Sequence, residues 1–154
     1  MKKLLLSFVI TAAFPLCASA DEAAVAKQME TGKTAFLTCA ACHGQDAMGV
    51  AAGPSKMAPA LVDSKIALGD PSIMALVIMK GIQKEGTTYL GMMMPLEAAL
   101  DDEKLAAVMT YVRGSFGNKA PAVTVEDAKK YREQWKDIKA PVTRAKLTEL
   151  SAGK

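Results

Sequence analysis

The sequence predicts an all-α domain. Several segments place apolar residues at helical spacing between N-cap and glycine stop signals, and no segment shows the alternating pattern typical of a strand. The chain of 154 residues is 51% hydrophobic but only 5% aromatic, and it contains ten methionines. This composition indicates one compact globular domain, or one domain with an appendage. It excludes a disordered chain and a large multidomain enzyme.

The first twenty residues have the pattern of a secretory signal peptide. Lys2 and Lys3 precede an apolar run over residues 4–16, and Ala18-Ser19-Ala20 forms a small-x-small cleavage site. An apolar run of about 13 residues is shorter than the ~20 that a membrane-spanning helix needs. We therefore expect a cleavable signal over residues 1–20, a periplasmic mature protein, and no integral membrane segment after cleavage. An uncleaved anchor is the alternative.

The first helix of the mature chain is expected over residues 23–37. This segment lacks proline, is rich in good helix formers, and places Met29 and Phe36 near one face. Gly32 is its one weak position. Glycine and proline accumulate over residues 44–63, which indicates an irregular loop.

A second helix is expected after Asp70. This residue is a favourable N-cap, Pro71 occupies the first helical position, an apolar stripe follows, and Gly81 marks the C-terminal end. Residues 83–100 are again loop-like and hold the run Gly91-Met92-Met93-Met94-Pro95.

The strongest amphipathic pattern begins at Asp101, the expected N-cap of a third helix. Leu105, Val108, Met109 and Val112 form its apolar stripe. Two acidic residues in its first turn interact favourably with the helix dipole. This pattern predicts a core helix that ends near the glycines before residue 118.

Residues 119–154 are expected to form a C-terminal helical extension and tail. Thr124 can cap a last helix that runs to about Trp135, with Ala128 and Tyr131 on the same face as Trp135. The sequence from Ala140 onward suggests a surface tail. The extension is either an interaction element for a partner or a helix packed back on its own domain.

The motif Cys39-Ala40-Ala41-Cys42-His43 is the most specific chemical signal. Two thiols three positions apart at a helix end can each add to a vinyl group of haem, and the next residue is placed as an axial iron ligand. A zinc site needs four ligands, a thioredoxin-type dithiol needs a βαβ context, and a disulfide across so short a loop adds little stability. The motif therefore predicts covalently bound haem c with its iron, one per chain.

The second axial ligand of this iron cannot be a histidine, because His43 is the only one. Methionine is the usual alternative in c-type haem proteins. Most methionines lie on expected helices, where filling the core is the simpler interpretation. Met92, Met93 and Met94 instead lie in a loop that can cross to the far side of a haem, and position alone leaves all three open.

From about Lys27 to Asn118 the sequence resembles the class I, monohaem cytochrome c family. The resemblance is carried by Gly32-x-x-x-Phe36 and the Cys-x-x-Cys-His motif, by Ala58-Pro59-Ala60-Leu61, by a methionine-proline loop, and by the segment over residues 100–113. It implies a cytochrome c fold, about four to five helices wrapped around one covalently attached haem, with residues 21–118 as the cytochrome c domain.

The resemblance also implies helix contacts and the orientation of the histidine. The first and last core helices are expected to cross near Gly32 and Phe36 against Leu105 and Tyr111. The carbonyl of Pro59 is expected to accept a hydrogen bond from the second ring nitrogen of the motif histidine.

Within the methionine triplet, the resemblance favours Met93. The pattern Tyr89-x-Gly91-x-Met93-x-Pro95-Leu96 is similar to the family variant in which one residue separates the ligand from the proline. Met94 and then Met92 follow as alternatives. The expected haem-binding residues are therefore Cys39, Cys42, His43 and Met93, with His43 and Met93 on the iron.

These features together predict a one-electron carrier in the periplasm that is not itself an enzyme. Its expected partners are redox proteins, an electron donor and an acceptor. The formal charge of +3 is too weak for nucleic-acid binding, and we expect a monomer. One alternative is a subunit of a periplasmic dehydrogenase or terminal oxidase complex. A haem enzyme or sensor with an open sixth site is a weaker alternative.

Overall fold

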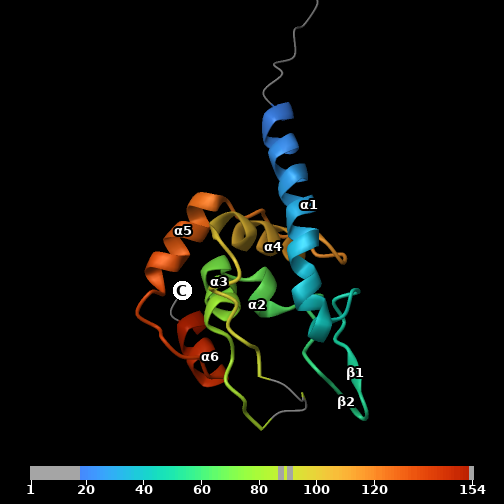
Figure 1. Cartoon of the computed structure of the whole chain (residues 1–154), viewed down its shortest axis with the longest axis vertical. Helices are drawn as coiled ribbons and strands as arrows, with labels where there is room; N and C mark the ends of the chain where they lie inside the picture. The colour runs from blue at the N-terminus through green and yellow to red at the C-terminus, as the bar shows by residue number, and fades with distance from the viewer. Residues whose placement is uncertain (1–17, 87–88, 90–91, 153–154) are drawn as a thin grey trace, which may run out of the picture.

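The computed structural model describes residues 18–86, 89 and 92–152, and these residues form a mostly helical body (Figure 1). The elements are, in order, α1 (Ala18–His43), β1 (Ala51–Ala52), β2 (Ser55–Lys56), α2 (Lys65–Leu68), α3 (Pro71–Lys80), α4 (Asp102–Gly114), α5 (Val125–Gln134) and α6 (Arg144–Ala152). The predicted all-α class is confirmed. Strands β1 and β2 pair antiparallel as a small hairpin within the expected loop over residues 44–63, and the sequence does not predict it.

Helices α1 and α4 cross where α1 carries no side chain. A Cβ on Gly32 would overlap the carbonyl oxygen of Ala107 and lie 2.6 Å from the Cβ of Tyr111. One turn later, the ring of Phe36 packs on Tyr111 with 5.4 Å between the ring centroids. The expected crossing is therefore present, although it falls on Ala107 and Tyr111, while Leu105 is fully buried in the core.

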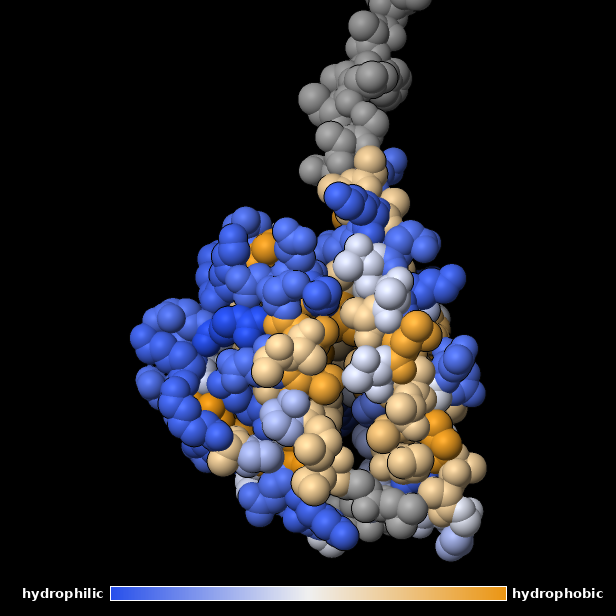
Figure 2. All heavy atoms as spheres, in the orientation of Figure 1, coloured by the Kyte–Doolittle hydropathy of each residue, from blue (hydrophilic) through white to orange (hydrophobic). Residues whose placement is uncertain are grey.

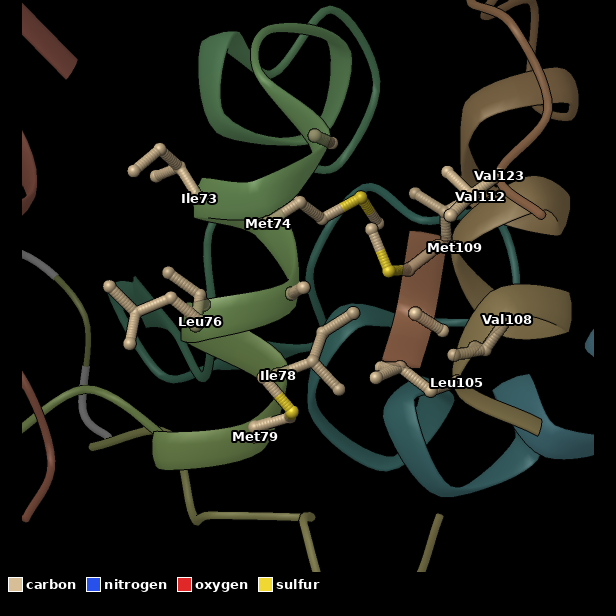
Figure 3. Packing of buried hydrophobic residues seen from close by; sticks show 14 of the residues in the cluster. Ile73, Met74, Leu76, Ile78, Met79, Leu105, Val108, Met109, Val112 and Val123 are labelled. Atoms are coloured by element: carbon tan, nitrogen blue, oxygen red, sulfur yellow. The ribbon is translucent and has the colours of Figure 1, made fainter. Parts of the chain in front are cut away.

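Helix α3 lies at the centre of the core. All its residues from 72 to 80 are buried. Figure 3 shows Met74 and Ile78 pointing toward side chains of α4, whereas Leu76 points to the opposite side. On other sides α3 contacts α5 and α6. A helix enclosed on several sides needs apolar residues around most of its circumference, which the sequence of α3 provides.

The C-terminal extension folds back on the domain. The indole Nε1 of Trp135 donates a hydrogen bond to the carbonyl oxygen of Ser72 in α3, at 2.8 Å. Val142 and Leu147 are 5% and 4% exposed. The expectation of a surface tail from Ala140 onward is therefore wrong, because this stretch contains α6 and two buried side chains.

Helix α1 is longer at both ends than the sequence predicts. It begins at Ala18, within the expected signal segment, and continues through the cysteine motif to His43. Residues 1–17 lie outside the described residues, so cleavage of the signal stays a prediction. Within the described part of the chain, no helix is long and apolar enough to cross a membrane.

The crossing of α1 and α4 gives a first prediction. Gly32→Ala is expected to lower the free energy of unfolding by about 1–3 kcal/mol, because the new methyl group must push α1 away from the backbone of α4. Urea denaturation measures this change. Gly86→Ala is the control, since a Cβ there meets no atom within 4 Å. Equal stability of both variants would contradict the close approach.

The N-cap of α4 gives a prediction on pH. The Asp101 carboxylate accepts a hydrogen bond from the Lys104 N–H at 2.8 Å, and this bond is the main reason that the pKa of Asp101 is lowered. A lowered folded-state pKa stabilises the protein above the unfolded pKa, and this stabilisation is lost as the pH falls through the folded value. Asp101→Ala should therefore lower the melting temperature at pH 7, with a difference that shrinks below about pH 4.

The matched control for this cap is Asp101→Asn. Asparagine is an equally good N-cap but does not titrate. Its melting temperature relative to Asp101→Ala should stay nearly constant between pH 7 and acid. If the wild-type advantage over alanine persists undiminished in acid, the charged cap is not its cause.

Candidate functional site

The cysteine motif lies at the C-terminal end of α1. The helix ends at His43, and Gly44 leaves it with a positive φ of 79°. Cys39 and Cys42 are half-buried free thiols. Residues three apart on a helix are neighbours on one face, so both sulfurs lie on the same side of α1. Burial raises the pKa of the Cys39 thiol to about 11, so this group is neutral at pH 7.

The imidazole of His43 is buried and held by one carbonyl. Its Nδ1 lies 2.9 Å from the carbonyl oxygen of Pro59. A carbonyl can only accept, so Nδ1 carries the proton and the lone pair of Nε2 is left for a metal. No residue in the described part of the chain hydrogen-bonds Nε2. The hydrogen bond that the resemblance implies is therefore present.

Burial also sets the charge of this imidazole. Desolvation lowers the pKa of His43, and the hydrogen bond to Pro59 offsets part of the effect. The net lowering favours the neutral ring at pH 7. Neutral imidazole is the form that binds iron, so the site prepares His43 for ligation.

Asn118 connects the loop behind His43 to α4, a role that the sequence does not reveal. This side chain is only 4% exposed. Its Oδ1 accepts from the Asp63 N–H at 3.1 Å, and its Nδ2 donates to the carbonyl oxygens of Leu61 at 3.2 Å and Val112 at 2.8 Å. Leu61 and Asp63 closely follow Pro59 in the chain. Asn118 therefore fixes the stretch that presents the carbonyl to the histidine.

The three candidate methionines differ in burial. Met92 and Met94 are 52% and 60% exposed, whereas Met93 is half-buried and packs against the core. The backbone of Met93 exchanges two hydrogen bonds with Ile82, of 2.9 and 3.0 Å. This pairing anchors the middle residue of the triplet at the end of α3. The burial pattern agrees with the preference for Met93, while its bond to iron stays a prediction.

The face of the molecule that bears these residues is hollowed. Figure 2 shows a narrow gap between two largely apolar surfaces. One is formed by the end of α1 with the β1–β2 hairpin, and the other by the connection from α3 to α4. Exposed methionines occur on both sides of the gap in sequence: Met48 and Met57 lie in the segment between α1 and α2, and Met92 and Met94 lie in the connection from α3 to α4. The hollow is thus bordered by the segments that carry the cysteine motif and Met93.

The chemistry of these side chains fits haem c. Two thiols on one face of a helix can form the thioether bonds, His43 offers a free ring nitrogen, and Met93 is a thioether of the kind found opposite histidine in c-type haem proteins. Among the described residues there is no cluster of three or more His, Cys, Asp or Glu that could hold a metal ion. Because one imidazole and one thioether provide only two ligands, this donor set suits an iron whose other positions are filled by a porphyrin.

These observations define a class of protein: an all-α domain with a covalent haem-attachment motif and a histidine oriented as an iron ligand. The sequence profile of the family described as Cytochrome c matches residues 29–115, from α1 to the end of α4. The match covers more than half of the chain, and the chain belongs to the cytochrome c family. Membership supports electron transfer with haem c and its iron. A comparison with curated protein sequences found no significant match.

The role of Asn118 is testable by mutation. Asn118→Ala is expected to lower the free energy of unfolding by about 1–3 kcal/mol, because the buried carbonyl oxygen of Val112 and the partly buried N–H of Asp63 and carbonyl oxygen of Leu61 lose their partner. Chemical denaturation measures the loss. The neighbouring Lys119 is exposed, so Lys119→Ala is the control. An Asn118→Ala protein as stable as this control would show that the loop does not depend on the amide.

Proposed function

We propose that the mature protein is a periplasmic one-electron carrier in which His43 and Met93 are the axial ligands of a haem attached to Cys39 and Cys42. The observation that carries this proposal is the geometry of His43. Its hydrogen bond to Pro59 leaves Nε2 as the ligating atom. The half-buried Met93 then supplies the second ligand from the opposite connection.

In this proposal each residue has a separate task. When bound, haem c supplies an iron that alternates between the ferric and ferrous states. Cys39 and Cys42 would attach the ring to the end of α1, and His43 and Met93 would be the two protein ligands of its iron. A thioether ligand favours the ferrous state, which raises the reduction potential. Full axial occupancy leaves no position for a substrate, which distinguishes a carrier from a haem enzyme or sensor.

The surface around the hollow suits brief contacts with redox proteins, an electron donor and an acceptor. Removing residues 1–20 removes two lysines from 19 basic residues and none of the 16 acidic ones, which leaves 17 against 16. A nearly neutral monomer has little long-range electrostatic steering. The exposed methionines Met48, Met57, Met92 and Met94 instead offer a flexible apolar contact surface.

A subunit role in a dehydrogenase or oxidase complex has weaker support. That role would use the extension as a docking element. The indole of Trp135 and the buried Val142 and Leu147 instead pack on the protein's own domain. The free carrier is therefore the function that these contacts favour.

Spectroscopy of the purified mature protein tests the proposal. The reduced-minus-oxidised spectrum should show c-type bands, and the ferric protein should show the near-infrared band of a thioether bound to iron. A high-spin ferric spectrum with rapid cyanide or carbon monoxide binding would instead indicate an open sixth site. Absence of c-type bands would contradict the proposal that the protein is a haem-c electron carrier.

Single methionine variants test the sixth ligand. Met93→Ala is expected to lose the near-infrared band and to bind cyanide rapidly, because the sixth position opens. Met92→Ala and Met94→Ala are matched controls from the same triplet and should keep the band. Loss of the band in Met94→Ala but not in Met93→Ala would assign the ligand to Met94.

A further inference from the structure

The connection that carries Met93 is held at both ends by the C-terminal extension. This connection runs from Gly81, after α3, to Asp102, at the start of α4. In Figure 1 it lies between α6 on one side and the end of α1 with the β1–β2 hairpin on the other. The inference below rests on the proposed ligation by Met93.

At the first end of the connection, residues 81–83 form backbone hydrogen bonds with two other segments, one at Met93 and one at Val142. On one side Ile82 exchanges hydrogen bonds with Met93, at 2.9 and 3.0 Å. On the other side the Val142 N–H donates to the carbonyl oxygen of Gly81 at 3.1 Å, and the Gln83 N–H donates to the carbonyl oxygen of Val142 at 3.0 Å. Val142 therefore binds the residues on either side of Ile82, and Ile82 in turn pairs with Met93.

Just beyond residues 81–83, Glu85 is tied to the first turn of α6. Its Oε2 accepts a hydrogen bond from the backbone N–H of Arg144 at 3.0 Å and another from Arg144 Nη1 at 2.9 Å. A carboxylate at a helix N-terminus interacts favourably with the helix dipole. Glu85 thus serves as a cap for α6 that is supplied by the methionine-bearing connection, and the two segments stabilise each other.

At its second end, the connection is clamped by Arg132 of α5. Arg132 Nε donates to Asp102 Oδ1 at 2.8 Å, and Nη2 donates to the carbonyl oxygen of Leu100 at 2.8 Å. Its Nη1 lies 3.8 Å from Glu97 Oε1. The other oxygen of Glu97 accepts a hydrogen bond at 2.6 Å from Lys80, whose side chain is only 7% exposed. One guanidinium therefore links the last residues of the connection to α5.

The extension itself is anchored independently of these clamps. The indole of Trp135 is bonded to the carbonyl oxygen of Ser72, and Ala128 is fully buried. Helix α6 also contacts α3, and its Leu147 is buried, so Arg132 and Arg144 both extend from elements that pack on the core. A connection held at two such points has less freedom to swing Met93 away from the hollow.

We propose that the extension is a strap that keeps Met93 on the iron, with Arg132, Val142 and Arg144 as positioning residues. A protein whose methionine must leave before another ligand enters has a closed and an open state. The apparent affinity for an external ligand is set by the population of the open state. Removing a strap contact should raise that population without changing the ligand atoms.

The test uses the full-length holoprotein and imidazole as the external ligand. Glu85→Ala and Arg132→Leu are each expected to bind imidazole to the ferric iron about tenfold more tightly than the wild type. Their near-infrared band should disappear at lower temperature, while both thioether attachments and the c-type spectrum remain. Amide hydrogen exchange at Ile82 and Met93 should also accelerate, which reports on the connection directly.

Two controls separate a strap from a general loss of stability. Ser64→Ala removes the N-cap of α2, whose Oγ accepts a hydrogen bond from the Ala67 N–H at 3.3 Å, and Ser64 lies outside both the extension and the connection. It should lower the free energy of unfolding while leaving the imidazole affinity unchanged. Lys146→Ala removes a 2.7 Å ion pair to Glu149 within α6 and should change neither quantity appreciably.

Different outcomes overturn the strap and the ligand assignment. Wild-type imidazole affinity in both Glu85→Ala and Arg132→Leu, with the band lost in Met93→Ala, overturns the strap alone. An equal rise of affinity in Ser64→Ala also overturns it, since loss of stability would then be the cause. Retention of the band in Met93→Ala overturns the Met93 assignment and the strap with it.

Discussion

The close contact of α1 with α4 at Gly32 is the constraint on which the rest of the molecule depends. Because the two backbones touch there, the cysteine motif at the end of α1 has a fixed position relative to both ends of α4. The first turn of α4 receives the methionine-bearing connection, and Asn118, just beyond its last turn, holds the loop behind the histidine. A shift of this crossing would therefore move both sides of the hollow at once.

The two sides of the site are held by different means. The histidine side is fixed by residues that precede the extension, through the Pro59 carbonyl and the buried amide of Asn118. The methionine side depends on charged and backbone contacts from the extension, of which Arg132 and Val142 are the main sources. Hydrogen bonds of a neutral amide depend little on the salt concentration, whereas the attraction between partly exposed charges weakens as salt is added. The methionine side should therefore be the more sensitive to solution conditions.

Local signals explain what the sequence predicts well. Helices α3, α4 and α5 begin where expected, because the side chains of Asp70, Asp101 and Thr124 each accept a hydrogen bond from their own first turn. Helix α6 also has a local cap, since Thr143 Oγ1 accepts a hydrogen bond from the Lys146 N–H at 3.1 Å, but its few apolar residues are separated by charges, and its second cap, Glu85, lies 59 positions away. The sequence does not reveal the role of the Asn118 amide either, since two of its three partners lie 55 and 57 positions away. The motif thus identifies the haem chemistry, but long-range contacts decide how each ligand is supported.

The backbone pairing at Ile82 has a consequence for the order in which the molecule is completed. The histidine and its Pro59 carbonyl are 16 positions apart and close a short loop, which forms early and at small entropic cost. The backbone contact between Gln83 and Val142 joins segments about 60 positions apart and needs nearly the whole chain to be present. The histidine side of the site therefore needs only a short loop to close, whereas the methionine side is complete only when residues as distant as 142 are in place.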